Sequence, residues 1–183
     1  MPDDNIRLSP SRLFAFAIDY GVIFACGAIL FGVTAAVLSP NLAEFDTTRP
    51  RIQQHALAFV TLTLPVWLYF TVLETGEPSA TLGKRLMKLR VASTGEGGIR
   101  FGQVAIRNAI KFAPWEIAHA AIWYVPQRPF LDPMPILNLA ACIMSCGIAL
   151  LFAFSLFIGD GRTPYERLSR TRVVRRASDT SKV

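Results

Sequence analysis

Long apolar runs alternate with short charged stretches along this chain. Three runs, residues 13–38, 56–73 and 136–158, can cross a bilayer as helices, because a hydrocarbon core about 30 Å thick needs roughly 20 mainly apolar residues. A fourth run, residues 104–125, has the required length but includes several ionisable side chains. The pattern therefore predicts an all-α membrane protein with three apolar spans and a fourth that hydropathy alone does not decide.

The distribution of basic residues indicates whether residues 104–125 cross the membrane. Residues 74–103 contain five basic and three acidic side chains, and residues 159–183 contain seven and three. Cytoplasmic segments of membrane proteins are enriched in Lys and Arg, so both segments are expected inside, which requires an even number of crossings between them. We therefore predict four transmembrane helices, arranged as two helical hairpins, with both termini cytoplasmic. The alternative is an amphipathic surface helix over residues 104–125, although its ionisable residues do not share one face.

Composition agrees with a multi-pass protein of the cytoplasmic (inner) membrane. Of 183 residues, 52% are hydrophobic and only 17% are charged, whereas a soluble domain usually has about 25% charged residues. Three cysteines are too few for a secreted disulfide scaffold. We expect a cytoplasmic tail at residues 1–12, a transmembrane domain at 13–158 with an inner loop at 74–103, and a basic tail at 159–183.

The net charge of +6 follows the predicted topology, so it suits a membrane surface better than nucleic acid. Basic segments at the inner surface attract anionic lipid head groups by about 1 kcal/mol per cation. We therefore expect the lipid bilayer and its anionic head groups as partners, and no nucleic acid. Four helices enclose little space, so a transport pathway requires a homo-oligomer, at least a dimer.

Two segments of the chain resemble each other. Residues 81–91 have the sequence TLGKRLMKLRV and residues 163–173 have TPYERLSRTRV, with five of eleven positions identical. Each copy ends a predicted helical hairpin, which favours a parallel repeat of two hairpins; convergence of two basic interfacial segments is the alternative. Residues 89–101 place three glycines between two short β-prone runs, which predicts a small local β-hairpin.

Ionisable side chains inside a bilayer cost free energy and are functional-site candidates by default. Asp19 and Lys111 lie at similar depths in two spans that start on the cytoplasmic side. This match makes Asp19–Lys111 the preferred ion pair, with Arg107, one turn shallower, as the second choice for Asp19. Arg12 lies near the interface, two turns before Asp19. A structural ion pair and a titrating site in a transport path are both open interpretations.

Glu116 and His119 lie deeper in the same span, and their Glu-x-x-His spacing places them on one helix face. This motif supplies iron ligands in some helical bundles, but those sites need two such motifs and two further glutamates. We therefore assign no metal and no cofactor, and expect either polar contacts between helices or a proton-accepting pair that faces water. No phosphate-binding loop, nucleophile elbow or zinc-protease helix occurs, so no catalytic residue is assigned and no enzyme activity is expected.

Three motifs together resemble the RDD family of integral membrane proteins, which is named for one arginine and two aspartates. The first motif is Arg-x-x-Ala-x-x-Ile-Asp, with Arg12 and Asp19 at its ends. The second contains Thr81, Gly83, Lys84, Arg85 and Arg90. The third is RTPYERLSRTRVV at residues 162–174, where Tyr165 and Glu166 replace the family's usual His-Asp and Arg167 matches the arginine that follows. The resemblance covers residues 7–175, and transport has been suggested for the family.

Two functions compete at this stage. The first is a small transporter subunit for ions or protons, with a pathway formed by Asp19, Lys111, Glu116 and His119. The second is a non-transporting interaction or scaffold module that binds lipid head groups or a partner through its basic segments, with ion pairs holding the bundle together. A hydrated cavity shared by Asp19 and Lys111 favours transport, whereas a sealed contact favours the scaffold.

Overall fold

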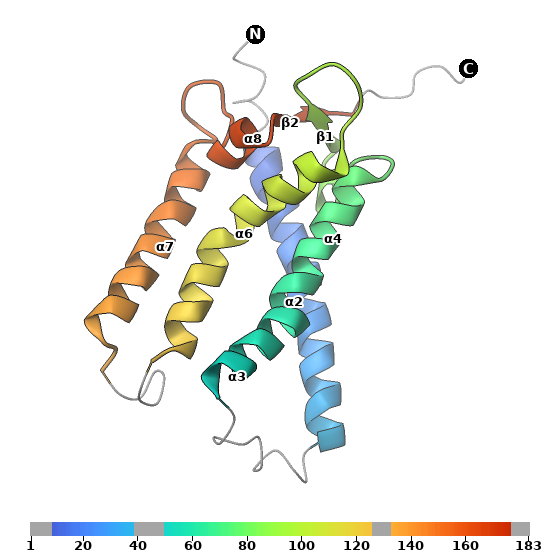
Figure 1. The fold of residues 1–183 in the computed structure, drawn as a ribbon. Coiled ribbons are helices and arrows are strands. Elements are labelled where there is room, and N and C mark those ends of the chain that lie inside the picture. Colours follow the sequence, from blue (N-terminus) through green and yellow to red (C-terminus); the bar gives the residue numbers. More distant parts are fainter. Residues whose placement is uncertain (1–8, 39–49, 126–132, 177–183) are drawn as a thin grey trace.

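The computed structural model describes residues 9–38, 50–125 and 133–176, and within these ranges the fold is mostly helical (Figure 1). Its long helical segments form a bundle in which α6 is central, because α6 packs on α4 and on α7. The segments are α2 (Ser9–Leu38), α6 (Phe101–Trp123), α7 (Ile136–Phe154) and a continuous run of α3 (Arg51–Ala58), the π-helical turn η2 (Phe59–Thr63) and α4 (Leu64–Thr75).

Four short elements lie together at one end of the bundle, which we call the sheet end (Figure 1). They are α5 (Leu82–Leu86), β1 (Leu89–Ser93), α8 (Pro164–Leu168) and β2 (Thr171–Arg175). The two strands form an antiparallel pair, α5 packs against α2, and α8 packs against α6. We call the opposite end, where α3 starts and α6 ends, the far end.

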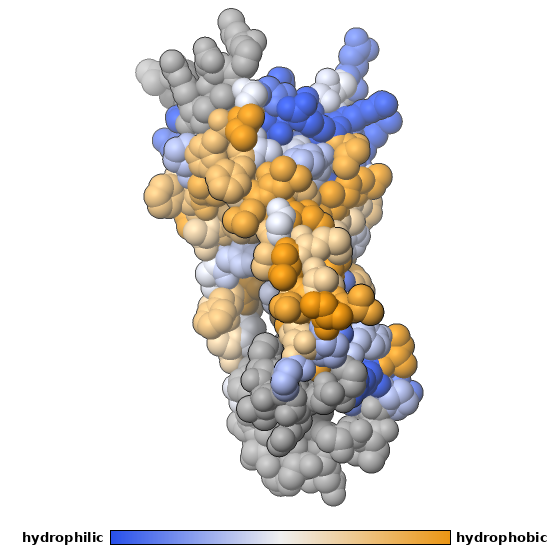
Figure 2. Space-filling model, turned by 90° about the vertical axis from the view of Figure 1, so that its left-hand side faces the viewer, coloured by the Kyte–Doolittle hydropathy of each residue, from blue (hydrophilic) through white to orange (hydrophobic). Residues whose placement is uncertain are grey.

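Three helical segments are long and apolar enough to cross a membrane: Ser9–Ile29, Arg51–Thr75 and Ile136–Phe154. Large apolar side chains point outward from them; Phe24 and Leu137, for example, are each 80% exposed. Figure 2 shows the resulting hydrophobic band below a hydrophilic sheet end. Such a surface fits lipid tails better than water, and it agrees with the predicted membrane location.

α6 contains most of the predicted span at residues 104–125, and it packs against α4 and α7. Its three charged side chains, Arg107, Lys111 and Glu116, distinguish it from the three apolar segments. Four crossings and cytoplasmic termini therefore stay predictions at this point.

The observed helices differ from the predicted spans mainly at their ends. The first begins at Ser9 rather than at residue 13, the second covers Arg51–Thr75 rather than 56–73, the third covers Phe101–Trp123 rather than 104–125, and the fourth ends at Phe154 rather than at 158. Hydropathy detects the apolar part of a helix, whereas helices also continue into polar residues up to their caps. Residues 1–8 and 177–183 of the predicted tails lie outside the described residues.

The two similar segments of the sequence fold alike. Each starts with a threonine that caps a five-residue helix, and each ends in a five-residue strand. Lys88 and Arg170, at matching positions between helix and strand, both have positive φ angles, 55° and 53°. The strands pair with Val91 opposite Val173, which are also matching positions. The two segments therefore share one local fold, as the similarity of their sequences predicts.

The local hairpin predicted for residues 89–101 is wrong. β1 pairs instead with β2, which follows the last helix of the bundle. The reason is burial: Leu89 of β1 packs with Val173 of β2 and Ala15 of α2, and each of these side chains is at most 2% exposed. Tertiary burial of an apolar strand face outweighs a local turn signal.

Candidate functional site

Charged side chains from five elements form one continuous network at the sheet end. The contacts run in the order Arg12, Glu166, Arg107, Glu74 and Lys84, which come from α2, α8, α6, α4 and α5. The N–O distances are 2.7 Å for Arg12–Glu166 and Lys84–Glu74, and 3.3 and 3.4 Å for the contacts of Arg107 with Glu166 and Glu74. Both carboxylates are fully buried, so each needs cationic partners to stay charged. The network thus joins the ends of the helices.

Asp19 lies beside this network, but its partners are neutral donors. Its carboxylate accepts hydrogen bonds from the Thr81 hydroxyl (2.6 Å), the Gly83 backbone N–H (2.8 Å) and the Tyr69 hydroxyl (3.1 Å). Thr81 is the N-cap of α5, where backbone N–H groups favour a nearby anion. Asp19 therefore attaches the first turn of α5 to α2.

The predicted ion pair between Asp19 and Lys111 does not form among the described residues, nor does the second choice with Arg107. The donors of α5 occupy the Asp19 carboxylate, and the two glutamates of the network occupy Arg107. The predicted pair was wrong because it was based on the depths of Asp19 and Lys111 along their helices and did not consider the inner loop. That loop folds back onto α2 and brings Thr81 and Gly83 to Asp19.

Glu166 links Arg12 to Arg107 in the network. Its Oε1 binds Arg12 and Arg107, and its Oε2 accepts a hydrogen bond of 2.9 Å from the backbone N–H of Thr163. Burial alone would raise the pKa of Glu166, but the charges of Arg107 and Arg12 outweigh burial and hold this pKa below its ordinary value. The carboxylate of the closing motif is therefore ionised at neutral pH, and it pairs with the arginine of the first motif.

The basic residues of the second and third motifs have two environments. Lys84 is buried in the network, whereas Arg85, Arg90 and Arg167 are exposed at the sheet end. Arg167 makes a surface ion pair of 2.6 Å with Asp160. Exposed pairs contribute little to stability, so this pair is separate from the buried network that joins the helices.

Lys111 differs from the cations of the network. Among the described residues, no carboxylate forms an ion pair with its ammonium, and aromatic rings surround it instead. The Nζ atom lies 3.6 Å from the ring centroid of Phe70, 4.9 Å from that of Phe16 and 5.1 Å from that of Phe112. Cation–π contacts compensate part of the cost of desolvation, but they supply no counter-charge.

The Lys111 side chain lines a cavity of about 390 Å³ between α2, α6 and α7, which we call the side cavity. The cavity is also bordered by Arg12, Lys84 and Arg107. The rest of its wall is mainly apolar and comes from all three helices. Two wall residues, Phe16 and Trp115, are 40% and 47% exposed, so the cavity opens on the flank of the bundle. It combines a cationic lining with apolar walls and a sideways entrance.

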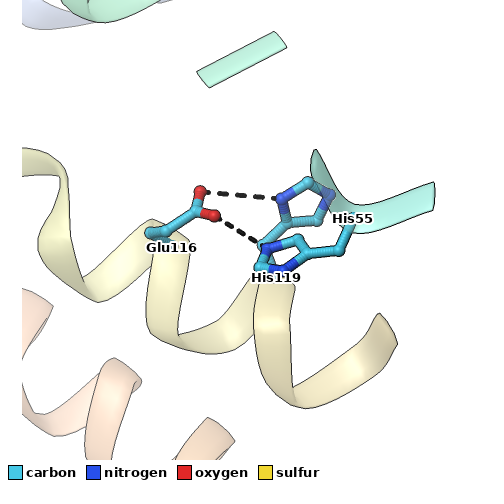
Figure 3. A group of neighbouring side chains, drawn as sticks. All are labelled: His55, Glu116 and His119. Carbon is cyan, nitrogen blue, oxygen red and sulfur yellow. Dashed lines mark hydrogen bonds and ion pairs between the residues drawn. The ribbon is translucent and has the colours of Figure 1, made fainter. Parts of the chain in front are cut away.

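Glu116 and His119 lie toward the far end of α6, and the structure adds His55 of α3 to them (Figure 3). Glu116 Oε1 lies 2.8 Å from His55 Nε2, and Glu116 Oε2 lies 3.7 Å from His119 Nδ1. The Thr63 hydroxyl donates a 2.8 Å hydrogen bond to Glu116 Oε2. The predicted polar contact between helices is present here, with partners that the prediction did not name.

Sequence reasoning missed Glu74 and His55. Glu74 follows directly after the second apolar run, so it was placed in the inner loop. His55 was placed in an outer loop because the predicted apolar run begins one residue later, at residue 56, whereas α3 already begins at Arg51. Nothing local in the sequence links His55 to Glu116, since their contact depends on how α3 packs against α6.

Comparison with protein families finds one match over most of the chain: the model of the RDD family matches residues 10–158. The matched range includes Arg12, Asp19 and the motif that begins at Thr81, and it ends before Glu166. No curated protein and no solved structure matches the chain.

Proposed function

This chain belongs to the RDD family, and from that premise we propose that it is a four-span protein of the cytoplasmic membrane that binds an anionic phospholipid in the side cavity. The sheet end is the cytoplasmic end, where the described part of the chain begins at Ser9 and ends at Arg176. Its outward-facing arginines support this orientation.

The observation that carries the binding proposal is the unpaired ammonium of Lys111 beside an open cavity. A cation within a membrane is costly unless an anion or a hydrated space compensates it. The neighbouring glutamates already have partners in the network. An anionic ligand that enters the side cavity supplies the missing counter-charge.

The shape of the side cavity favours a lipid over a soluble anion. Its walls are apolar and it opens on the flank of the bundle, where lipids diffuse laterally. A phosphate group next to Lys111 would leave its acyl chains along Phe16, Trp115 and the facing side of α7. Lys acts as a point charge toward phosphate, and the guanidinium groups of Arg12 and Arg107 add positive potential.

Lipid-dependent thermal stability tests the proposal on purified protein in detergent. We expect phosphatidylglycerol to raise the melting temperature and phosphatidylcholine to have little effect. In Lys111→Gln, phosphatidylglycerol should bind about tenfold more weakly, which is about 1.4 kcal/mol. Arg90→Gln, an exposed basic residue of β1, is the matched control and should keep the lipid response.

Three outcomes would contradict lipid binding at Lys111. Equal stabilisation by both phospholipids would show that charge plays no part, and an unchanged response of Lys111→Gln would place the lipid elsewhere. Stabilisation by oleate alone would assign the cavity to a free fatty acid instead. Because Lys111→Gln removes an uncompensated charge, it should itself be at least as stable as the unchanged protein without lipid, so loss of folding is not expected to obscure the result.

Ion or proton transport is the second candidate. The observation in its favour is that α6 carries ionisable groups at several depths, with Lys111 at the side cavity and Glu116 toward the far end. The sealed contacts of Asp19 favour binding over transport. In proteoliposomes, a transporter requires flux above that of empty vesicles, and Lys111→Gln and Glu116→Gln should each reduce this flux while expression and oligomer size stay unchanged.

A further inference from the structure

His55, Glu116 and His119 bring three metal-ligating side chains together at the far end of the bundle, and we call them the His–Glu–His cluster (Figure 3). One donor atom from each lies within 4.8 Å of the other two. The chain contains two histidines, and both are in this cluster. They come from α3 and α6, so the cluster depends on the tertiary fold.

The local structure orients the cluster. At about 100° per residue, positions eight apart on a regular α-helix face directions that differ by roughly 80°. Between His55 and Thr63, however, the chain passes through the π turn η2, which uses more residues per turn. Both side chains consequently reach Glu116, one at each carboxylate oxygen. A π turn of this kind occurs often at functional sites.

His119 shows that the cluster is incomplete as a hydrogen-bonded group. Its Nδ1 is buried without a hydrogen-bond partner and faces Glu116 Oε2 at 3.7 Å. Its Nε2 accepts a 2.8 Å hydrogen bond from the indole N–H of Trp123, so the proton of a neutral ring is on Nδ1. Buried polar atoms of this kind call for an explanation, and an ion is one of the standard ones.

We propose that the His–Glu–His cluster binds one divalent transition-metal ion, with Zn²⁺ as the best fit. Two imidazoles and one carboxylate are a ligand set that Zn²⁺ takes in proteins, with a fourth position left for water. His55 Nε2, a Glu116 oxygen and His119 Nδ1 are the ligand atoms. Small side-chain rotations bring them to one ion, because ligands at about 2.0–2.2 Å from zinc lie no more than roughly 4 Å apart. This inference is independent of lipid binding at the side cavity.

Metal binding also has a defined effect on the neighbouring residues. With the ion on Nδ1 of His119, the ring proton has to be on Nε2, so the hydrogen bond from Trp123 must break. Thr63 can keep its bond to the carboxylate and hold it in place, as outer partners of metal ligands do. A cavity between η2, α4 and α6 is lined by Thr63 and Glu116, so it borders the carboxylate side of the cluster.

The test uses full-length protein without a histidine tag, purified in detergent, treated with EDTA and dialysed. We expect one Zn²⁺ per chain by elemental analysis, a Co²⁺ absorption spectrum of a four- or five-coordinate site, and a change in tryptophan fluorescence on binding. His55→Ala, Glu116→Gln and His119→Ala should each weaken binding at least tenfold. Trp123→Phe removes the competing hydrogen bond and should bind at least as tightly.

Two controls separate metal binding from loss of folding and from the lipid proposal. Glu77→Gln changes an exposed carboxylate near the sheet end and should bind Zn²⁺ as the unchanged protein does, and Lys111→Gln should do the same. Binding that survives both histidine substitutions would overturn the proposal. If the variants aggregate, an electron paramagnetic resonance spectrum of Cu²⁺ bound to the unchanged protein replaces them as the test. We expect this spectrum to show coupling to two imidazole nitrogens. A spectrum without that coupling would also overturn the proposal.

Discussion

Gly83 stands at the closest approach of α5 to α2. A methyl group at this position would overlap the backbone carbonyl oxygen of Ala15 and touch the Asp19 carboxylate. Gly83→Ala should therefore push α5 away from α2, weaken the hydrogen bonds of Asp19 and lower the free energy of unfolding by about 1–3 kcal/mol. Thermal unfolding in detergent measures the effect.

Gly102, near the start of α6, is the matched control for this substitution. A Cβ atom there meets nothing within 4 Å, and alanine favours a helix over glycine by up to about 1 kcal/mol. Gly102→Ala should leave the melting temperature unchanged or raise it slightly. Equal destabilisation by both substitutions would show that close packing of α5 on α2 is not the reason.

Glu166 links stability to pH at the residue scale. Its pKa in the folded protein is lowered by Arg107 and Arg12 relative to an ordinary value of 4.5, so its contribution is complete above that ordinary pKa and is lost as the pH falls through the lowered value. At pH 7, Glu166→Gln should destabilise the protein by about 3–5 kcal/mol, because it leaves buried Arg12 without its anion and buried Arg107 with Glu74 as its remaining carboxylate partner.

The difference between the unchanged protein and Glu166→Gln should shrink only below about pH 4.5. Melting temperatures at a series of pH values from 7 to 3 measure it. Asp160→Asn, which removes the exposed ion pair with Arg167, should change stability little at any pH. A difference that already disappears between pH 7 and 5 would contradict an ionised Glu166 in the network.

At the scale of elements, the pairing of β1 with β2 can be trapped by a disulfide. Arg90 lies opposite Val174 in the register, and directly opposite Cβ atoms are about 4.5–5.5 Å apart. In a background without the native cysteines, Arg90→Cys with Val174→Cys should cross-link on oxidation, as detected by a gel-mobility shift. The control is Arg90→Cys with Arg172→Cys, which lies two residues from Val174 on β2 and should cross-link much less. More cross-linking in the control than in the Arg90–Val174 pair would contradict the register.

The elements divide clearly into those that the sequence predicts and those that it does not. Apolar runs predict the long helices because burial in lipid acts on every residue of a span. The repeat predicts that residues 81–91 and 163–173 fold alike, since similar local sequences have similar caps and turns. The partner of β1 was not predictable in the same way. Leu89 and Val91 can be buried against any apolar surface, and only the tertiary fold brings β2 next to β1.

At the scale of the whole molecule, the motifs of the family describe contacts rather than separate sites. Arg12 of the first motif binds Glu166 of the third, and Asp19 of the first binds Thr81 of the second. The motifs contain these residues, but Asp19 was paired with Lys111, because depth along a helix is the only measure of distance that the sequence offers. The contact of His55 with Glu116 was not predicted for the same reason, because the two residues are close in space but distant along the chain.

The strand pair also constrains how the whole chain crosses the membrane. β1 precedes α6 and β2 follows α7, and because the two strands pair, they must lie on the same side of the bilayer. If α7 crosses once, α6 has to cross as well, whatever its polar content. A fluorescent reporter fused after Val183 should therefore be active in the cytoplasm, and a periplasmic phosphatase fused there should be inactive. A cysteine at Gly97 should be accessible from the same side as the C-terminus; accessibility of the two from opposite sides would contradict both the four-span topology and the strand pair on which it rests.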